Sequence, residues 1–235
     1  MTRNRPPKRL ALTGLCFAIV GALALSPTAV PARAHSGAEV PAPVQQPATA
    51  RPDDVVTRVW KADLGNSWVR GCPTRPRKLR AIDINHWDYD GQLQRGRIIV
   101  HRKAVGVVRK ALRRAFKTGF AIHEMTPVQK YNSSDNRSMR ADNTSGFSCR
   151  KIPGSTRWSE HAKGTAIDMN PRRNPHVFSY KLLPGNARAF VKRRPVQKGM
   201  LTKRSAVSRV FANHGWTWGG TYRNPDYQHY SRSGR

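Results

Sequence analysis

Acidic residues are scarce in this sequence of 235 residues. Asp and Glu together number 13 against 43 Lys and Arg, which gives a formal net charge of +30 at pH 7. A charge of this size raises encounter rates with polyanions but says nothing about the fold. The basic residues are scattered along the chain, so an alternative interpretation is that they only solvate the surface. No tandem of basic and aromatic residues suited to stacking on a nucleic-acid strand is present, and we expect no nucleic-acid partner.

Long apolar runs are missing as well. The most apolar stretch, residues 10–25, is shorter than the roughly 20 residues that a membrane-spanning helix needs. Four basic residues precede it and Ala32-Arg33-Ala34 follows it, a pattern typical of a secretory signal peptide. We therefore predict a signal peptide over residues 1–34 and a secreted, extracellular protein. Cleavage after Ala34 would remove five basic and no acidic residues and leave a net charge of +25.

Cysteine is nearly absent, with three residues in the whole chain. Cys16 lies in the predicted signal peptide, which leaves Cys72 and Cys149. A lone pair of cysteines in an oxidising compartment usually bonds, so we predict a disulfide between them. The alternative is a zinc site with two cysteine ligands, but the sequence lacks the C-x-x-C spacing that such sites use.

The remaining chain divides into a linker and one domain. Residues 35–57 are rich in Pro, Ala and Gln without apolar periodicity, which predicts a flexible linker. Residues 58–235 are enough for one ordinary domain with its own core.

Helical and strand patterns are mixed within residues 58–235. We predict helices over 104–116 and 206–211, and strands over 97–101, 120–125, 164–169, 216–218 and 227–230. Residues 132–157 and 171–199 show almost no periodicity, and long irregular segments of this kind are commonly functional. The mixed order favours an α+β fold with an antiparallel sheet.

The few acids in the last third of the chain lie close to histidines. From residue 151 onward there are 17 Lys or Arg but only three acids, Glu160, Asp168 and Asp226. A hydrolytic zinc site needs three His or carboxylate ligands, an open position for water and a base. His161, Asp168 and His229 could be the ligands, with Asp226 in a turn as the spare carboxylate. The alternative is that the histidines are ordinary residues and that the aspartates balance nearby arginines.

Several motifs resemble one family when they are taken together. These are residues 159–168 (SEHAKGTAID), Asn170-Pro171, Asn174-Pro175, residues 215–220 (GWTWGG) and residues 226–229 (DYQH), with further matches upstream at 71–73 (GCP) and 143–150 (NTSGFSCR). Together they resemble the zinc D-alanyl-D-alanine carboxypeptidase and L-alanyl-D-glutamate endopeptidase superfamily. The resemblance covers most of residues 70–231. It implies a small antiparallel sheet flanked by helices, with a zinc site on the sheet face.

The resemblance also implies roles for individual residues. His161, Asp168 and His229 occupy the zinc-ligand positions, and Asp226 stands where the family has its catalytic Glu or Asp. Ser159 matches a serine that the family uses for substrate binding. The family also binds substrate through an upstream arginine, for which Arg150 is our choice over Arg137 and Arg140.

The implied substrate is the stem peptide of bacterial peptidoglycan, and anionic cell-wall polymers are the expected partners of the basic surface. The bond cleaved stays open between a terminal D-Ala and a bond inside the stem. A cell-wall-binding module without catalytic activity is the alternative function. Trp216, Trp218, Tyr227 and Tyr230 are candidates to wall the site, with core packing as the other possibility.

Overall fold

The computed structural model describes residues 49–234, all of which belong to the second of two units of the chain, residues 43–235. The predicted signal peptide and residues 35–48 of the predicted linker lie outside the described residues. No helix among the described residues has the length and apolar character needed to cross a membrane.

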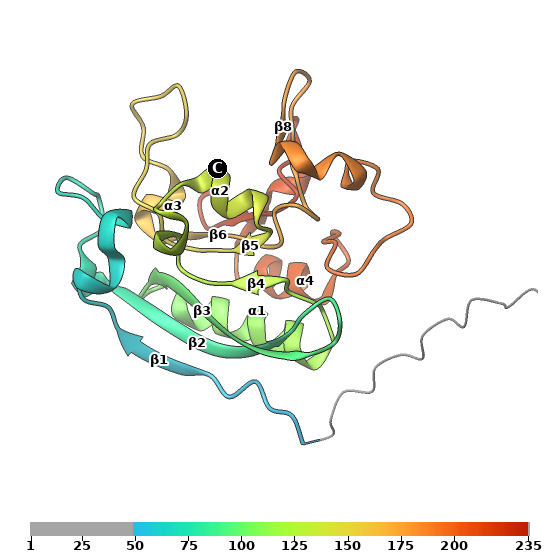
Figure 1. The fold of residues 1–235 in the computed structure, drawn as a ribbon, viewed down its shortest axis with the longest axis horizontal. Coiled ribbons are helices and arrows are strands. Elements are labelled where there is room, and N and C mark those ends of the chain that lie inside the picture. Colours follow the sequence, from blue (N-terminus) through green and yellow to red (C-terminus); the bar gives the residue numbers. More distant parts are fainter. Residues whose placement is uncertain (1–48, 235) are drawn as a thin grey trace, which may run out of the picture. The chain divides into compact units, whose positions relative to one another are not determined.

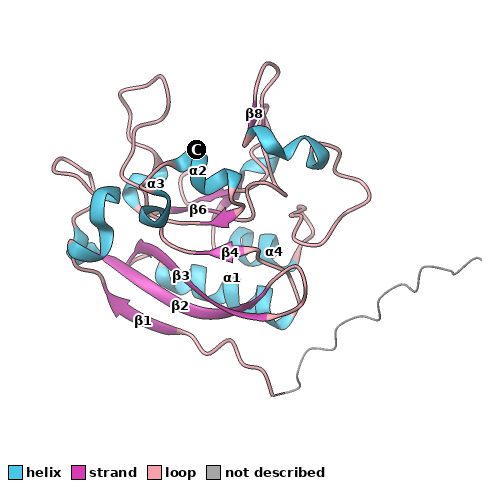
Figure 2. Ribbon diagram, viewed as in Figure 1, coloured by secondary structure: helices cyan, strands magenta, loops and turns pink. Residues whose placement is uncertain are grey.

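A three-stranded antiparallel sheet forms one side of this unit (Figures 1 and 2). Its strands lie in the order β1 (Val55–Arg58), β2 (Leu79–Trp87) and β3 (Leu93–His101). Helix α1 (Val105–Lys117) packs on the inner face of this sheet, because its buried residues recur at helical spacing from Val107 to Phe116. The helix ends where Gly119 takes a positive φ of 64°.

The ordered domain begins earlier than residue 58, where the sequence places its boundary. Val55–Arg58 pairs with β2, and Asp54 has a side chain only 2% exposed that forms ion pairs with Arg109 and Arg113 of α1. The end of the predicted flexible linker is therefore part of the folded unit. Arg109 and Arg113 of α1 are the partners that hold Asp54 in place, and the composition of residues 35–57 does not indicate this pairing.

A second antiparallel sheet carries the predicted site. It consists of β6 (Ala166–Asp168), β10 (His229–Ser231) and β9 (Thr217–Trp218), in that order. Helix α4 (Ala206–Asn213) precedes β9, and the 3-10 helix η5 (Gly219–Thr221) follows it. The α+β class and the small antiparallel sheet are confirmed, although the strands divide among several sheets.

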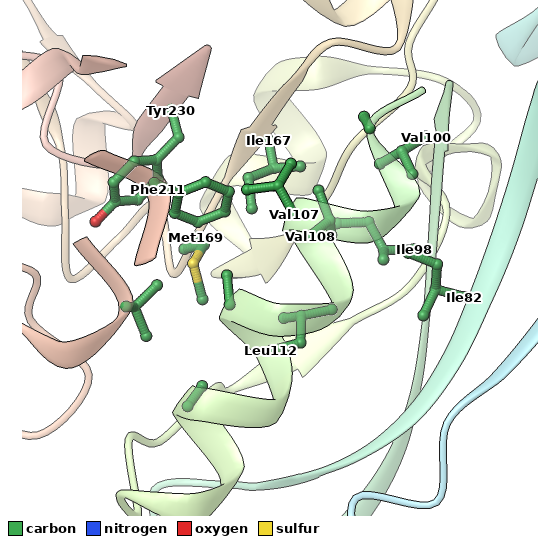
Figure 3. Close-up of a cluster of buried hydrophobic side chains, with 14 of the residues drawn as sticks. Ile82, Ile98, Val100, Val107, Val108, Leu112, Ile167, Met169, Phe211 and Tyr230 are labelled. Atoms are coloured by element: carbon green, nitrogen blue, oxygen red, sulfur yellow. The ribbon is translucent and has the colours of Figure 1, made fainter. Parts of the chain in front are cut away.

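The main core lies between these two sheets, with α1 in the middle (Figure 3). Val108 and Leu112 of α1 lie between Ile82 and Ile98 of the first sheet and Ile167 of β6. Met169, Phe211 and Tyr230 complete the core on the far side of the helix. Ile167 and Met169 face this core, as the alternation along residues 164–169 predicts, while Asp168 points to the opposite face.

Shorter elements fill the irregular segments. They are β4 (Glu124–Met125), β5 (Asn143–Thr144), β7 (His176–Val177), β8 (Leu182–Leu183), α2 (Asp135–Arg140), α3 (Glu160–Lys163), and the 3-10 helices η1 (Ala62–Ser67), η2 (Pro76–Lys78), η3 (Val128–Tyr131) and η4 (Gly185–Phe190). β4 pairs with β5 in parallel, which the sequence does not predict, and β7 pairs with β8 as a hairpin. The predicted strand over 120–125 is reduced to β4.

The predicted disulfide between Cys72 and Cys149 is present, with a Cα–Cα distance of 5.9 Å. A second apolar cluster surrounds it and includes Leu64, Phe147 and Ala162. The bridge thus ties the loop before β2 to the segment that leads into α3. Ala162 follows directly on the candidate ligand His161.

Candidate metal centre

Asp168 and His229 lie directly opposite each other on neighbouring strands. β6 and β10 are antiparallel, and their register pairs His229 with Asp168. Residues opposite each other in such a pair project from the same face of the sheet. Asp168 Oδ1 lies 2.9 Å from His229 Nδ1, and both side chains are buried.

His161 reaches the same point from α3. Ser159 caps this helix, since its hydroxyl accepts a hydrogen bond from the backbone N–H of His161. Gly164 ends the helix with a φ of 69°, and a Cβ at this position would lie 2.7 Å from the backbone nitrogen of His101. The short helix therefore holds the His161 ring in place, with Nε2 3.3 Å from both Asp168 Oδ2 and His229 Nδ1.

A backbone carbonyl fixes the tautomer of His161. The Nδ1–H of this residue donates to the carbonyl oxygen of Gly146 at 2.7 Å. The lone pair on Nε2 is then directed toward Asp168 and His229, as in many sites where a second hydrogen bond orients a metal-binding histidine. Gly146 can approach so closely because it has no side chain; a Cβ there would lie 2.3 Å from the carbonyl oxygen of Ile99.

These three side chains fit a metal ion. Their ligand atoms all lie within 4.8 Å of one another. Two imidazoles and one carboxylate are the donor set of many catalytic zinc sites, which keep a fourth position open. Burial raises the pKa of Asp168, but the two nearby imidazoles outweigh it and hold the pKa well below its usual range. A lowered pKa favours the ionised carboxylate, which is the form that binds a metal ion.

Asp226 lies beside this cluster in the turn before β10, as strand alternation predicts. Its Oδ2 is 3.2 Å from His176 Nδ1, whereas its Oδ1 is buried and has no hydrogen-bond partner among the described residues. Burial raises the pKa of Asp226; His229 and His176 oppose this and the charge of Asp168 adds to it, and the net result is a raised pKa. A raised pKa makes this carboxylate a better proton acceptor near neutral pH.

The third acid near a histidine, Glu160, has a different environment. Its carboxylate accepts hydrogen bonds from Lys163 at 2.7 Å and from Thr165 at 2.8 Å. Although burial raises the pKa of Glu160, the contacts with Lys163 and Thr165 lower it below its ordinary value. This arrangement stabilises the end of α3 and makes Glu160 a poorer proton acceptor than Asp226.

A cavity of about 620 Å³ contains the candidate ligands and Asp226. Two loops form its walls, one through residues 150–158 and one through the β7–β8 hairpin, and both rise on the same side of the molecule (Figure 1). Within residues 49–234, six buried side-chain polar atoms lack a hydrogen-bond partner, and four of them belong to residues that line this cavity. The four are Arg150 Nε, Tyr222 Oη, Asp226 Oδ1 and Gln228 Oε1. Such a concentration of unpaired polar atoms indicates a site built for a polar ligand.

The two predicted substrate-binding residues, Ser159 and Arg150, both line this cavity. Arg150 also forms an ion pair with Asp135 of α2 at 2.8 Å, which holds its guanidinium at the cavity wall. Arg137 and Arg140, the other candidates, do not line the cavity. Direct contact of Ser159 and Arg150 with a substrate stays a prediction.

The aromatic side chains around the site are not those that the sequence suggests. None of Trp216, Trp218, Tyr227 and Tyr230 lines the cavity. Trp216 and Tyr230 are core residues, Trp218 packs against the core, and the ring of Tyr227 lies 4.4 Å from the guanidinium of Arg193. The core-packing alternative thus holds for most of this group.

The cavity is lined instead by Trp158, Phe178, Tyr180 and Tyr222, together with His176. His176, Phe178 and Tyr180 lie in the irregular segment 171–199, so only the general expectation that long irregular segments are functional points to them. Trp158 directly follows the irregular segment 132–157, and Tyr222 lies in the turn between β9 and β10.

A buried His, Asp and His cluster shares one cavity with a carboxylate that has one unpartnered oxygen among the described residues, and this arrangement defines a candidate metal-dependent hydrolase. A family model described as D-alanyl-D-alanine carboxypeptidase matches residues 153–232, the segment that contains all three candidate ligands and Asp226. The match confirms the resemblance stated from the sequence and indicates a peptidase. No curated protein and no solved structure matches the chain.

Proposed function

We propose that the protein is a secreted zinc peptidase that hydrolyses the stem peptides of bacterial peptidoglycan. The observation that carries this proposal is the placement of Asp226. Its unpartnered Oδ1 is buried in the same cavity as His161, Asp168 and His229. An unpartnered acceptor in this position is suited to receive a proton from the water molecule that attacks the scissile carbonyl.

His161, Asp168 and His229 would hold the zinc ion through Nε2, a carboxylate oxygen and Nδ1. Bound zinc would lower the pKa of a water molecule and polarise the scissile carbonyl. Asp226 Oδ1 accepts the proton of the attacking water and then returns it to the leaving amine, acting first as general base and then as general acid. His176, at 3.2 Å from the other oxygen, holds the carboxylate in one orientation during both transfers.

Arg150 and the aromatic residues would bind the substrate. The unpaired Arg150 Nε offers a charged donor to a peptide carboxylate, such as that of a terminal D-Ala or of D-Glu in the stem. Phe178, Tyr180 and Trp158 provide apolar surface along the cavity walls for the rest of the peptide. Ser159, which lines the cavity and caps α3, would bind a backbone group of the peptide.

Digestion of purified peptidoglycan tests this function directly. The zinc-loaded protein without residues 1–34 is incubated with the wall material, and the soluble and wall-bound peptides are analysed by mass spectrometry. Loss of a terminal alanine identifies a carboxypeptidase, whereas release of peptides cut within the stem identifies an endopeptidase. Asp226→Asn serves as the matched inactive control. Binding to the wall without any cleavage would contradict the proposal and favour a binding module, and cleavage of plasmid DNA in a parallel reaction would indicate a nuclease.

A further inference from the structure

A second cavity, of about 900 Å³, lies outside the segment that matches the peptidase family. Its lining residues come from the end of β1, the segments before and after η1, η2 and the start of β2. The end of β1 and the start of β2 lie together at one end of the first sheet (Figure 2). We call it the cationic groove, because six basic residues and no carboxylate line it. The six are Arg58, Lys61, Arg70, Arg75, Arg77 and Arg80.

Several arginines outside the groove, in the same half of the chain, are paired with carboxylates. Arg97 pairs with Asp83, and Arg109 and Arg113 pair with Asp54. Within residues 49–234, by contrast, no ion pair with a carboxylate involves a basic residue of the groove. Among the described residues, the chain thus uses several of its few acids to neutralise arginines elsewhere and leaves the six cations of the groove without a carboxylate partner; Arg80 donates only to the backbone carbonyl oxygens of Arg77 and Leu79.

The pairing of β1 with β2 increases the concentration of positive charge. Their register places Arg58 directly opposite Arg80. Like charges at opposite positions of an antiparallel pair destabilise it, since the side chains project from the same face. An anionic group bound between the two guanidinium groups would remove this repulsion.

Tryptophans add an apolar surface to the groove. Trp60 is 67% exposed, which is unusual for so large an apolar side chain, whereas Trp68, which also lines the groove, is half-buried. The indole Nε1 of Trp68 donates to the carbonyl oxygen of Thr74 at 2.9 Å, so this ring is fixed in the wall. Only Trp60 is free to lie along a ligand, whereas single-stranded nucleic acid is usually bound on several exposed rings in succession.

We propose that the cationic groove binds a phosphodiester polymer of the cell wall, a chain of polyol or sugar units joined by phosphates. Arginine is the side chain best suited to phosphate, because its planar guanidinium donates two parallel hydrogen bonds. Trp60 contacts the carbon skeleton between two phosphates. This inference names a partner for the peptidase proposed above, but it concerns binding by residues 58–80 and does not need the metal.

The disulfide gives the groove a structural connection to the cavity that contains the candidate metal ligands and Asp226, which we call the catalytic cavity. Cys72 lines the groove and is bonded to Cys149, and the next residue, Arg150, lines the catalytic cavity. Attachment of a wall polymer at the groove would therefore hold the catalytic cavity close to the peptidoglycan to which such polymers are linked.

Binding of poly(glycerol phosphate) teichoic acid to the metal-free protein tests the proposal. The triple variant Arg58→Gln, Arg70→Gln, Arg75→Gln removes three cations of the groove, and Arg188→Gln, Arg204→Gln, Arg209→Gln removes three exposed cations elsewhere. We expect the groove variant to bind about tenfold or more weakly and to show a smaller salt dependence, because it contacts fewer phosphates. The control variant should lose about twofold or less.

Equal losses in the two triple variants would overturn the proposal, because the binding would then depend only on net charge. Tighter binding of a single-stranded oligonucleotide than of the teichoic acid would overturn the class of ligand. Trp60→Ala provides a further check that leaves the charge unchanged, and it should weaken binding to the teichoic acid by severalfold. Hydrolysis of a short soluble peptide should be the same in the groove variant and the wild type, which separates failure of this inference from failure of the proposed catalytic function.

Discussion

The two halves of the described chain differ in how they are built and in what they contribute. Residues 49–152 contain two strands of nine residues and a helix of 13 residues, which form the long sheet and most of the core. Residues 153–234 contain strands of two or three residues, yet they provide all three candidate ligands and Asp226. The first half is a scaffold specified by apolar periodicity, and the second is a site specified by individual residues.

The division is not complete, because the scaffold also orients the site. The carbonyl of Gly146 fixes the tautomer of His161, and Arg150 forms part of the cavity wall. Even so, substitutions should separate the scaffold from the site. Substitutions in the second half should affect metal binding or activity at nearly unchanged stability, whereas substitutions in the first half should affect stability first.

The largest effect is expected from removal of a candidate ligand. His161→Ala or His229→Ala leaves two ligands, which is too few to hold zinc in a site of this kind. The zinc content, measured by elemental mass spectrometry, should fall to background. Hydrolysis of a stem peptide should fall to background as well. A variant that keeps one zinc per chain would show that the replaced histidine is not a ligand.

Asp226→Asn should separate catalysis from metal binding. The amide keeps the shape of the side chain but cannot accept the proton, so turnover should fall by about 10²- to 10⁴-fold while zinc is retained. Asp168→Asn is the matched comparison, since a neutral amide is a weak zinc ligand and the metal itself should be lost. Nearly normal turnover in Asp226→Asn would assign that residue a structural role and make Glu160 the next candidate for the base.

The disulfide belongs to the scaffold, and its removal tests whether the first half of the described chain contributes stability rather than metal binding. The bridge joins residues 77 positions apart, so in the loop-entropy model its loss should lower the free energy of unfolding by about 4 kcal/mol. The double variant Cys72→Ala, Cys149→Ala should melt at a lower temperature and still bind zinc when it is folded. Loss of zinc at a temperature where circular dichroism shows a folded chain would mean that the bridge also positions His161.

The smallest effect concerns Asp54, at the start of the folded unit. Burial raises the pKa of Asp54, but the hydrogen bonds and charges of Arg113 and Arg109 outweigh it and lower the pKa. A carboxylate with a lowered pKa in the folded state stabilises the protein above its unfolded pKa of about 3.9, and this contribution is lost as the pH falls through the lower, folded value.

Asp54→Asn should cost about 1–2 kcal/mol at pH 7, because both arginines are partly exposed to solvent. The difference in unfolding free energy between variant and wild type should shrink as the pH falls through this range. Denaturant titrations at pH 7 and pH 3 measure it. A difference that is independent of pH would show that the carboxylate charge is not what attaches this segment to α1.

The sequence predicts the scaffold and the site to different extents. The helix over residues 104–116 is confirmed because its apolar residues repeat at helical spacing. β2 is not predicted, although Ile82 and Ile84 alternate with polar residues, since Asp83 and Asn85 have low strand propensity. Within residues 132–157, which the sequence predicts to be irregular, α2 forms behind a Ser134 cap that is a signal in the sequence.

The convergence of His161, Asp168 and His229 could be predicted because each residue lies in a recognisable motif. The surrounding contacts could not. Gly146 meets His161 and His176 meets Asp226 only through the tertiary packing of segments 15 and 50 residues apart, respectively. The sequence favours the aromatic residues of the strands, but these pack mainly in the core, and the cavity is lined by aromatic residues of the loops and turns.

The location of zinc in crystals of the metal-loaded protein tests the central claim most directly. An anomalous difference map collected at the zinc absorption edge should show one strong peak per chain, bounded by His161 Nε2, Asp168 and His229 Nδ1 and close to Asp226 Oδ1. A map with no peak at this position, or with zinc bound elsewhere on the chain, would contradict the account.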